Sequence, residues 1–116
     1  MVTINTFKRL ALALPEAVEL PHFENTSIKV NKKIFATLNT PQNRATVKLS
    51  AVDQDVFCAF DHTVIYPVPN KWGKQGWTHV DLQTVREDML TDLLKTAYRE
   101  VAPKKLAAMV TFDERF

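Results

Sequence analysis

One stretch of sequence, Val68-PNKWGKQGWTHVD-Leu82, holds both glycines, both tryptophans and one of the three histidines of the chain. Glycine permits a positive φ angle or a close approach of two backbone segments, so Gly73 and Gly76 predict a loop of defined shape. This loop leads directly into residues 77–82, whose alternating side chains are typical of a strand. A basic, aromatic loop that feeds a strand indicates a binding surface, and we expect the rest of the fold to be organised around it.

Further strands are expected where apolar and polar residues alternate or short apolar runs occur. They cover residues 26–30, 33–39, 44–49 and 63–66. Along residues 44–49 the apolar side chains alternate with Arg44, Thr46 and Lys48, so these three polar residues share one face. Pro67 and Pro69 place the run 63–66 at an edge of the sheet or at an exit from it.

The register of the hairpin between residues 26–30 and 33–39 has two solutions. With an odd number of loop residues, Phe35 faces outward beside four basic residues, Lys29, Lys33, Arg44 and Lys48. With a two-residue loop, Phe35 faces inward with Ile28 and Val30. A shift of one residue reverses the facing of every side chain, so the sequence leaves both registers open.

Two helices are expected before residue 63. The first covers residues 4–14, with Thr3 as its cap and Pro15 as its end. Residues 15–25 contain two prolines and no clear period, which favours an ordered connection. The second helix begins after Ser50 and carries four apolar residues along one stripe, Val52, Val56, Phe57 and Phe60. Cys58 is expected to pack there as a small side chain, because no neighbouring histidine or cation would activate the thiol.

The last long helix has the clearest sequence signals. Thr84 and Glu87 form a capping box, and an apolar stripe from Val85 to Val101 must cover the sheet. Pro103 allows a further helical turn over residues 103–109. We therefore expect a single domain over residues 1–109 and an untethered tail over residues 110–116.

These elements predict an α+β domain, in which helices pack on an antiparallel sheet. Five segments resemble those of the MmcQ/YjbR family of small bacterial proteins, in the family's order: LALALPEAVE, KVNKKIFATL, RATVKLS, VPNKWGKQGWTHVDL and AYREVAPKKL. The resemblance extends over residues 4–108. It implies the order α-β(3)-α-β(2)-α, a layout similar to secretion-chaperone-like and bacterial frataxin-like domains, and a label of DNA binding. It implies no established catalytic residue.

Composition indicates a soluble, cytoplasmic protein. The 116 residues suit one domain, and the single cysteine cannot form an internal disulfide. No apolar run is long enough for a membrane span, and the first residues lack the features of a signal peptide. The net charge of +2 is small, but residues 26–50 contain five basic side chains and no acidic one. The distribution of charge therefore says more about partners than its sum.

The sequence shows no catalytic, cofactor or metal motif. The three histidines, His22, His62 and His79, have no metal-ligand spacing. The loop at Gly73 and Gly76 lacks the spacing and the following helix of a phosphate-binding P-loop. We therefore expect a protein that is not an enzyme and uses no cofactor.

Two binding functions remain. The first is nucleic-acid binding, with DNA as the partner, through a basic sheet face and the 71–77 loop; its candidate residues are Lys29, Lys33, Arg44, Lys48, Lys71, Trp72 and Lys74. A solvated basic face would serve solubility equally well. The second is a chaperone-like module that holds a segment of a partner protein. Trp72 is expected to be more exposed than Trp77, because Trp77 begins a strand.

Overall fold

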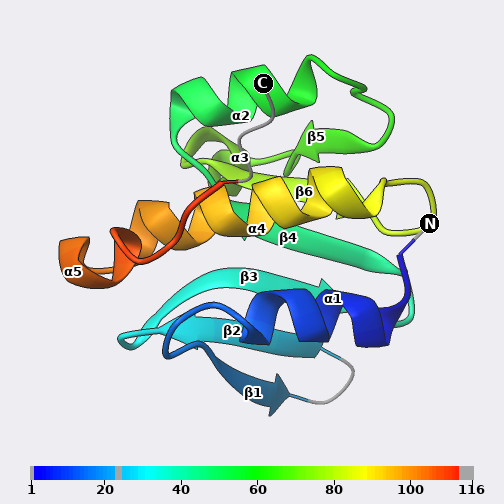
Figure 1. Ribbon diagram of the computed structural model, residues 1–116. Coiled ribbons are helices and arrows are strands. Elements are labelled where there is room, and N and C mark those ends of the chain that lie inside the picture. Colours follow the sequence, from blue (N-terminus) through cyan, green and yellow to red (C-terminus); the bar gives the residue numbers. More distant parts are fainter. Residues whose placement is uncertain (1, 23–24, 113–116) are drawn as a thin grey trace.

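The computed structural model describes residues 2–22 and 25–112, which form a six-stranded antiparallel sheet and five helices (Figure 1). The elements in chain order are α1 (Ile4–Leu12), β1 (Val18–His22), β2 (Asn25–Val30), β3 (Lys33–Asn39), β4 (Arg44–Lys48), α2 (Ala51–Cys58), β5 (Ile65–Pro67), α3 (Lys71–Lys74), β6 (Trp77–Asp81), α4 (Glu87–Val101) and α5 (Lys104–Ala107). The predicted α+β class, with helices on an antiparallel sheet, is confirmed.

The first strand, β1, was not expected from the sequence. It lies within residues 15–25, which we predicted to be a connection, and it pairs with β2 through Val18 opposite Lys29. Its alternation is interrupted by Pro21, a residue tolerated here because β1 is an edge strand. The observed order thus adds β1 and the single-turn helix α3 to the expected α-β(3)-α-β(2)-α, and the further helical turn expected over residues 103–109 is confirmed as α5.

The sheet order is β1-β2-β3-β4-β6-β5, so β6 is inserted between β4 and β5. The chain leaves β4, forms α2 and the edge strand β5, and returns through α3 to place β6 beside β4. In this pairing Arg44 lies opposite Asp81, and Lys48 lies opposite Trp77. Residues far apart in the sequence therefore meet in the interior of the sheet.

The β2–β3 hairpin has a two-residue turn followed by a bulge. Asn31 and Lys32 form the turn and both have positive φ angles, 48° and 70°, as a tight hairpin turn requires. The register shifts between Ile28 and Lys29, which leaves Phe35 as the extra residue of β3. Phe35 faces inward, as the two-residue loop predicts.

The bulge also restores the inward facing of the residues that follow it. Ala36 and Leu38 are fully buried together with Phe35, whereas Ile34 is only partly buried. A regular strand would bury alternate residues only. Because of this extra residue, Phe35 faces inward as in the register with a two-residue loop, and Ala36 and Leu38 face inward as in the register with an odd loop.

Helices α1 and α4 cover one face of the sheet, which we call the inner face (Figure 1). From α4, the predicted stripe contributes Leu90, Leu93, Leu94, Ala97 and Tyr98 to the core. The Tyr98 ring meets Phe35 edge to face at 5.4 Å between centroids, and its hydroxyl donates to the Pro15 carbonyl at 2.6 Å. Tyr98 therefore joins α4 both to the sheet and to the end of α1.

Both glycines of the central stretch are required by close backbone contacts. A Cβ at Gly73 would lie 1.9 Å from the Val68 carbonyl oxygen, and one at Gly76 would lie 1.8 Å from that of Leu49. Gly76 also has a φ angle of +104°, which L side chains rarely adopt. The expectation of a shaped loop is confirmed, and its centre is the single turn of helix α3.

The observed starts of α1 and α2 agree with the caps predicted from the sequence, and the start of α4 does not. The Thr3 and Ser50 side chains accept hydrogen bonds from backbone N–H groups of the first turns of α1 and α2, each at 3.1 Å. The predicted capping box at Thr84 is wrong. Residues 82–84 form a turn after β6, Thr84 donates its N–H to the Asp81 carbonyl, and α4 begins only at Glu87.

Helix α2 packs differently from the expected apolar stripe. None of its residues is buried, and Val52, Val56 and Phe60 are exposed. The helix lies beside the edge strand β5, where little of its surface can reach the core. It is held by Phe57 and Cys58, which are partly buried against the core, and by Gln54, whose amide donates to the Gly73 carbonyl at 2.9 Å.

The described part of the C-terminal segment is docked on α4. Val110 is buried, Lys95 Nζ donates to the Thr111 carbonyl at 2.8 Å, and the Phe112 ring lies 5.7 Å from the Arg99 guanidinium carbon. The expectation of an untethered tail is therefore wrong for residues 110–112. Residues 113–116 lie outside the described part of the chain.

Candidate nucleic-acid interface

The face of the sheet opposite α1 and α4, here called the outer face, holds the candidate site. Cross-strand partners point to the same face, and the pairing assigns these side chains to it: Val18, Leu20, Asn25, Ser27, Lys29, Ile34, Thr37, Asn39, Arg44, Thr46, Lys48, Tyr66, Trp77, His79 and Asp81. None of these side chains is buried. The outer face is therefore accessible to a ligand.

Three of the four basic strand residues named from the sequence lie on this face. Lys29, Arg44 and Lys48 are outward and partly exposed. Lys33 does not join them, because it pairs with the buried Val30 and so points to the inner side at the hairpin end. The two-residue turn, which places Phe35 inside, is the reason for this difference.

The three residues named from the loop lie at one end of the sheet rather than on it. Lys71, Trp72 and Lys74 all belong to α3, and all are exposed. Trp72 is 51% exposed and Trp77 only partly so, as we predicted. Gln54 of α2 bonds to the backbone of α3, so one side of this short helix is already occupied.

The middle of the outer face carries a row of uncharged side chains, most of them polar or aromatic. One such row crosses all six strands through Leu20, Ser27, Thr37, Thr46, His79 and Tyr66. Thr46 Oγ1 lies 2.8 Å from His79 Nδ1, and the rings of His79 and Tyr66 meet at 5.5 Å between centroids. Trp77 lies on the same face two residues before His79, and we call Trp77, His79 and Tyr66 the aromatic group at the β5–β6 side.

His79 is held towards its neutral form. Burial first, and then the nearby Arg44 guanidinium, lower the pKa of His79 below its usual value. Charge on this face therefore comes mainly from Lys29, Arg44 and Lys48, opposed by the Asp81 carboxylate. The alternation of residues 77–82 could have shown that Trp77 and His79 share a face, but only the β5–β6 pairing places Tyr66 beside them.

A hollow of about 280 Å³ lies at the end of the outer face where β4, β6 and β5 meet. Its walls are Gln42, Arg44, Tyr66, Asp81 and Gln83. Arg44 and Asp81 are cross-strand partners, yet no nitrogen of Arg44 lies within 4.0 Å of a carboxylate oxygen of Asp81. Both charged groups thus remain available to a ligand.

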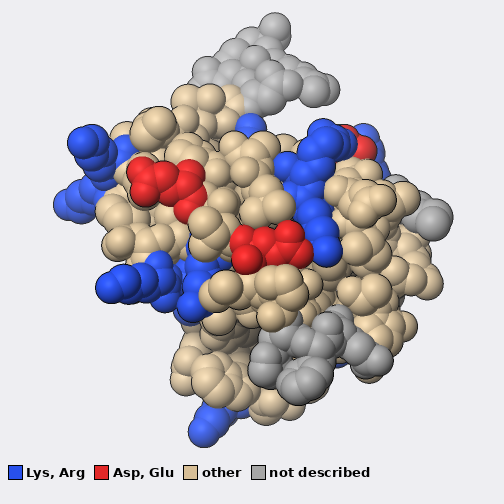
Figure 2. Space-filling model, turned by 90° about the horizontal axis from the view of Figure 1, so that it is seen from below, with Lys and Arg blue, Asp and Glu red and all other residues tan. Residues whose placement is uncertain are grey.

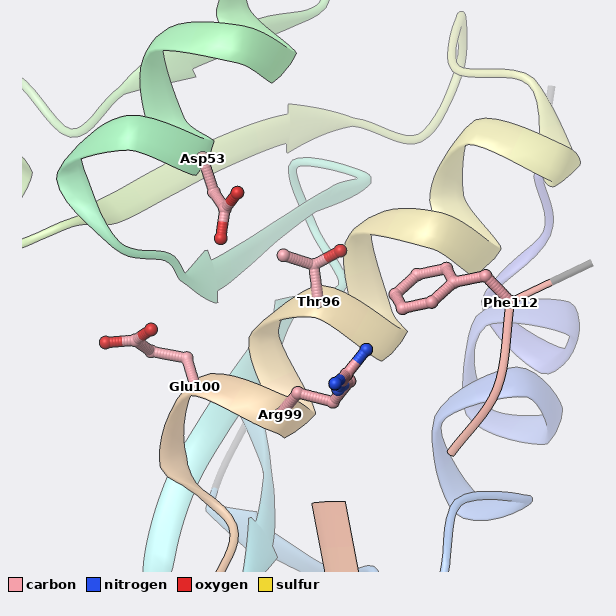
Figure 3. Close-up of a pocket in the computed structure, with 5 residues that line it drawn as sticks. All are labelled: Asp53, Thr96, Arg99, Glu100 and Phe112. Atoms are coloured by element: carbon pink, nitrogen blue, oxygen red, sulfur yellow. The ribbon is translucent and has the colours of Figure 1, made fainter. Parts of the chain in front are cut away.

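A larger hollow, of about 340 Å³, lies on the helix side between α2 and α4 (Figure 3). In Figure 3, Asp53 points from α2 towards α4, and Arg99 points towards Phe112. Thr96 and Glu100 complete its lining. The guanidinium of Arg99 is engaged by the aromatic ring, so this hollow offers two carboxylates and a hydroxyl but no nucleophile paired with a base.

Charge elsewhere on the surface is mixed. Seen from below the view of Figure 1, blue basic and red acidic groups alternate between wide uncharged areas (Figure 2).

Among residues 2–22 and 25–112, no group of three His, Cys, Asp or Glu side chains is arranged to hold a metal ion. Within those same residues, no helix has the length and apolar character needed to cross a membrane.

Comparison with known proteins gives a family and a structural relative. The YjbR family model matches residues 12–100. The crystal structure of protein DR2400 from Deinococcus radiodurans, which contains a DUF419 domain, superposes with a TM-score of 0.77 and 24% sequence identity, covering 90% of this chain and 82% of that one. At this identity the likeness shows the shared fold. No curated protein matches the chain.

Proposed function

The chain belongs to the YjbR family, and from the outer face of its sheet we propose that it binds single-stranded nucleic acid, with DNA as the first candidate. The observation that carries the proposal is the grouping of Lys29, Arg44 and Lys48 with Trp77 and Tyr66 on one accessible surface. Cations contact phosphates, and aromatic rings stack on bases that a duplex would keep paired. We further propose that the protein is cytoplasmic and is not an enzyme.

The sizes of these two interactions fit a weak, salt-sensitive binder. Stacking of one base on an aromatic side chain contributes roughly 1–3 kcal/mol, and each phosphate neutralised on a single strand contributes about −0.7 to the slope of log affinity against log salt. Three cations therefore predict a slope of about −2. Lys71 and Lys74, at the end of the sheet, would extend a longer strand and steepen the slope.

The test is a salt titration of binding to a fluorescently labelled oligothymidylate, followed by anisotropy. Lys29→Ala should weaken binding and flatten the slope by about 0.7, because one phosphate contact is lost. The matched control is Lys33→Ala, which removes a lysine from the same hairpin but from the opposite side of the sheet. It should leave both affinity and slope close to those of the wild type.

Two results would contradict the proposal. The first is a wild type with no measurable binding at low salt. The second is a pair of lysine variants that weaken binding equally, because such a result would indicate a general effect of net charge rather than a contact on the outer face.

A second function is favoured by the free edge of β1. Val18 and Leu20 are 53% and 46% exposed on this edge strand. An edge strand with exposed apolar side chains can accept a strand from another protein. This chaperone-like alternative predicts peptide binding that varies little with salt and is lost in a Leu20→Lys variant, whereas nucleic-acid binding would persist in that variant.

A further inference from the structure

We propose that the hollow lined by Gln42, Arg44, Tyr66, Asp81 and Gln83 is a base-binding subsite that selects guanine in a single strand. The inference rests on the proposed function, since it names the base that the outer face would prefer. It makes the hollow a specificity site beside a surface that otherwise contacts phosphates and stacks on bases.

The Asp81 carboxylate determines the choice of base. One of its oxygens, Oδ1, accepts a hydrogen bond from Gln83 N–H at 2.9 Å, and no Lys, Arg or His nitrogen among the described residues lies within 4.0 Å of the carboxylate. It can therefore accept further N–H groups. Guanine presents two adjacent donors, N1–H and the N2 amino group, whereas the pairing edges of adenine, cytosine and thymine each place an acceptor beside a donor.

Arg44 complements the adjacent, Hoogsteen edge of the same base. Its Nε is buried, so a ligand acceptor can reach the guanidinium only through the two Nη groups, and these make no ion pair with any described carboxylate. Guanine O6 and N7 are the acceptors that arginine most often contacts in pairs. As cross-strand partners, Arg44 and Asp81 have Cβ atoms roughly 4.5–5.5 Å apart, which allows both side chains to reach one planar ligand.

The other walls suit a flat aromatic ligand. Tyr66 supplies a ring for stacking, and it is held in place by its edge-to-face contact with His79. The side-chain amides of Gln42 and Gln83 can each donate and accept hydrogen bonds. A volume of about 280 Å³ is close to the lower limit for small-ligand pockets, roughly 300 Å³, and fits a single base.

The test uses labelled oligothymidylates of about 12 nucleotides, within the range of site sizes for one small domain. One central thymidine is replaced by dG, dA or dC, and affinities are compared at a fixed salt concentration. The dG strand should bind the wild type at least about 5-fold more tightly than the other three. Asp81→Asn should abolish this ratio while the dT strand still binds, because the amide oxygen keeps the bond to Gln83 but the NH₂ group opposes the guanine donors.

The matched control is Asp92→Asn, which removes an exposed carboxylate from α4 on the other side of the sheet and should keep the preference for dG. Equal affinity of the wild type for all four strands would overturn the guanine subsite and leave the proposed function standing. A dG preference that persists in Asp81→Asn would also overturn it. Absence of binding to every strand would remove the proposed function and the subsite together.

Discussion

The two faces of the sheet are built from neighbouring residues of the same strands, yet they differ in nearly every property. On the inner face, side chains such as Ile28, Phe35, Val47 and Val80 are completely buried under α1 and α4. On the outer face no described side chain is buried, and cations, hydroxyls and aromatic rings outnumber the aliphatic groups, which are Val18, Leu20 and Ile34. One face is therefore available for binding because the other supplies the stability of the fold.

This difference has a practical consequence for mutagenesis. Substitutions on the inner face should lower the free energy of unfolding, and substitutions on the outer face should change binding with little effect on stability. Adjacent residues that point to opposite faces provide matched pairs. The first prediction below uses such a pair, and the next two compare the outer face with residues elsewhere in the fold; they run from the largest expected effect to the smallest.

The largest effect is expected from Phe35→Ala, compared with Ile34→Ala. Phe35 is fully buried at the bulge and packs against Tyr98, so its loss should cost roughly 3–5 kcal/mol of unfolding free energy. Ile34 is its neighbour on the outer face and keeps part of its surface exposed, so its replacement should cost only about 1 kcal/mol. Urea denaturation would measure both values. Similar losses in the two variants would mean that the faces are not as different as the register indicates.

A smaller effect is expected when a tyrosine hydroxyl is removed on either side of the sheet, at Tyr98 in α4 or at Tyr66 in β5. Tyr98→Phe deletes the hydrogen bond to the Pro15 carbonyl and should lower stability by about 1 kcal/mol. Tyr66→Phe removes a hydroxyl with no hydrogen bond to any described residue, and it should leave stability within about 0.5 kcal/mol of the wild type. Thermal melts of the two variants provide the measurement. A Tyr66→Phe variant that loses as much as Tyr98→Phe would contradict the comparison.

The smallest effect concerns the pH dependence of stability and His79. Its pKa is lowered in the folded protein, first by burial and then by Arg44, so the unfolded chain binds this proton more readily. The contribution of His79 to stability is complete above the unfolded pKa, about 6.5, and is lost as the pH falls towards and through the lower folded pKa.

A His79→Gln variant should therefore lose less stability than the wild type between about pH 6.5 and more acidic conditions. Urea midpoints at a series of pH values would show the difference. His62→Gln, which removes an exposed histidine outside the sheet, controls for the loss of a histidine as such. Identical pH profiles for the wild type and His79→Gln would show that the outer face imposes no cost on a charged imidazole.

Much of the candidate site could be predicted from local alternation, and the part that could not depended on pairing between distant strands. Arg44, Thr46 and Lys48 share a face in any strand that includes them, because side chains alternate with a period of two. The facing of Lys33 was undetermined, since it depends on the length of the turn, and the facing of Ala36 and Leu38 depends in addition on the bulge at Phe35. The hollow at Asp81 and Tyr66 requires the insertion of β6 between β4 and β5, which no local pattern specifies.

The sequence by itself determined the features that depend on one residue and its near neighbours. These include the caps at Thr3 and Ser50, the two glycines of the shaped loop, the edge position of the strand that ends at Pro67, and the apolar stripe of α4. Each follows from backbone geometry or from burial at a fixed period, and both act over a few residues.

The tertiary structure decided what depends on partners elsewhere in the chain. It made a strand of residues 18–22, whose backbone hydrogen bonds require β2, and it left the apolar residues of α2 exposed beside an edge strand. It also gave the outer face its three cations, its aromatic group and its hollow. The physical reason is that strand pairing and helix docking join groups far apart in the sequence, and local propensity contains no information about which partner is chosen.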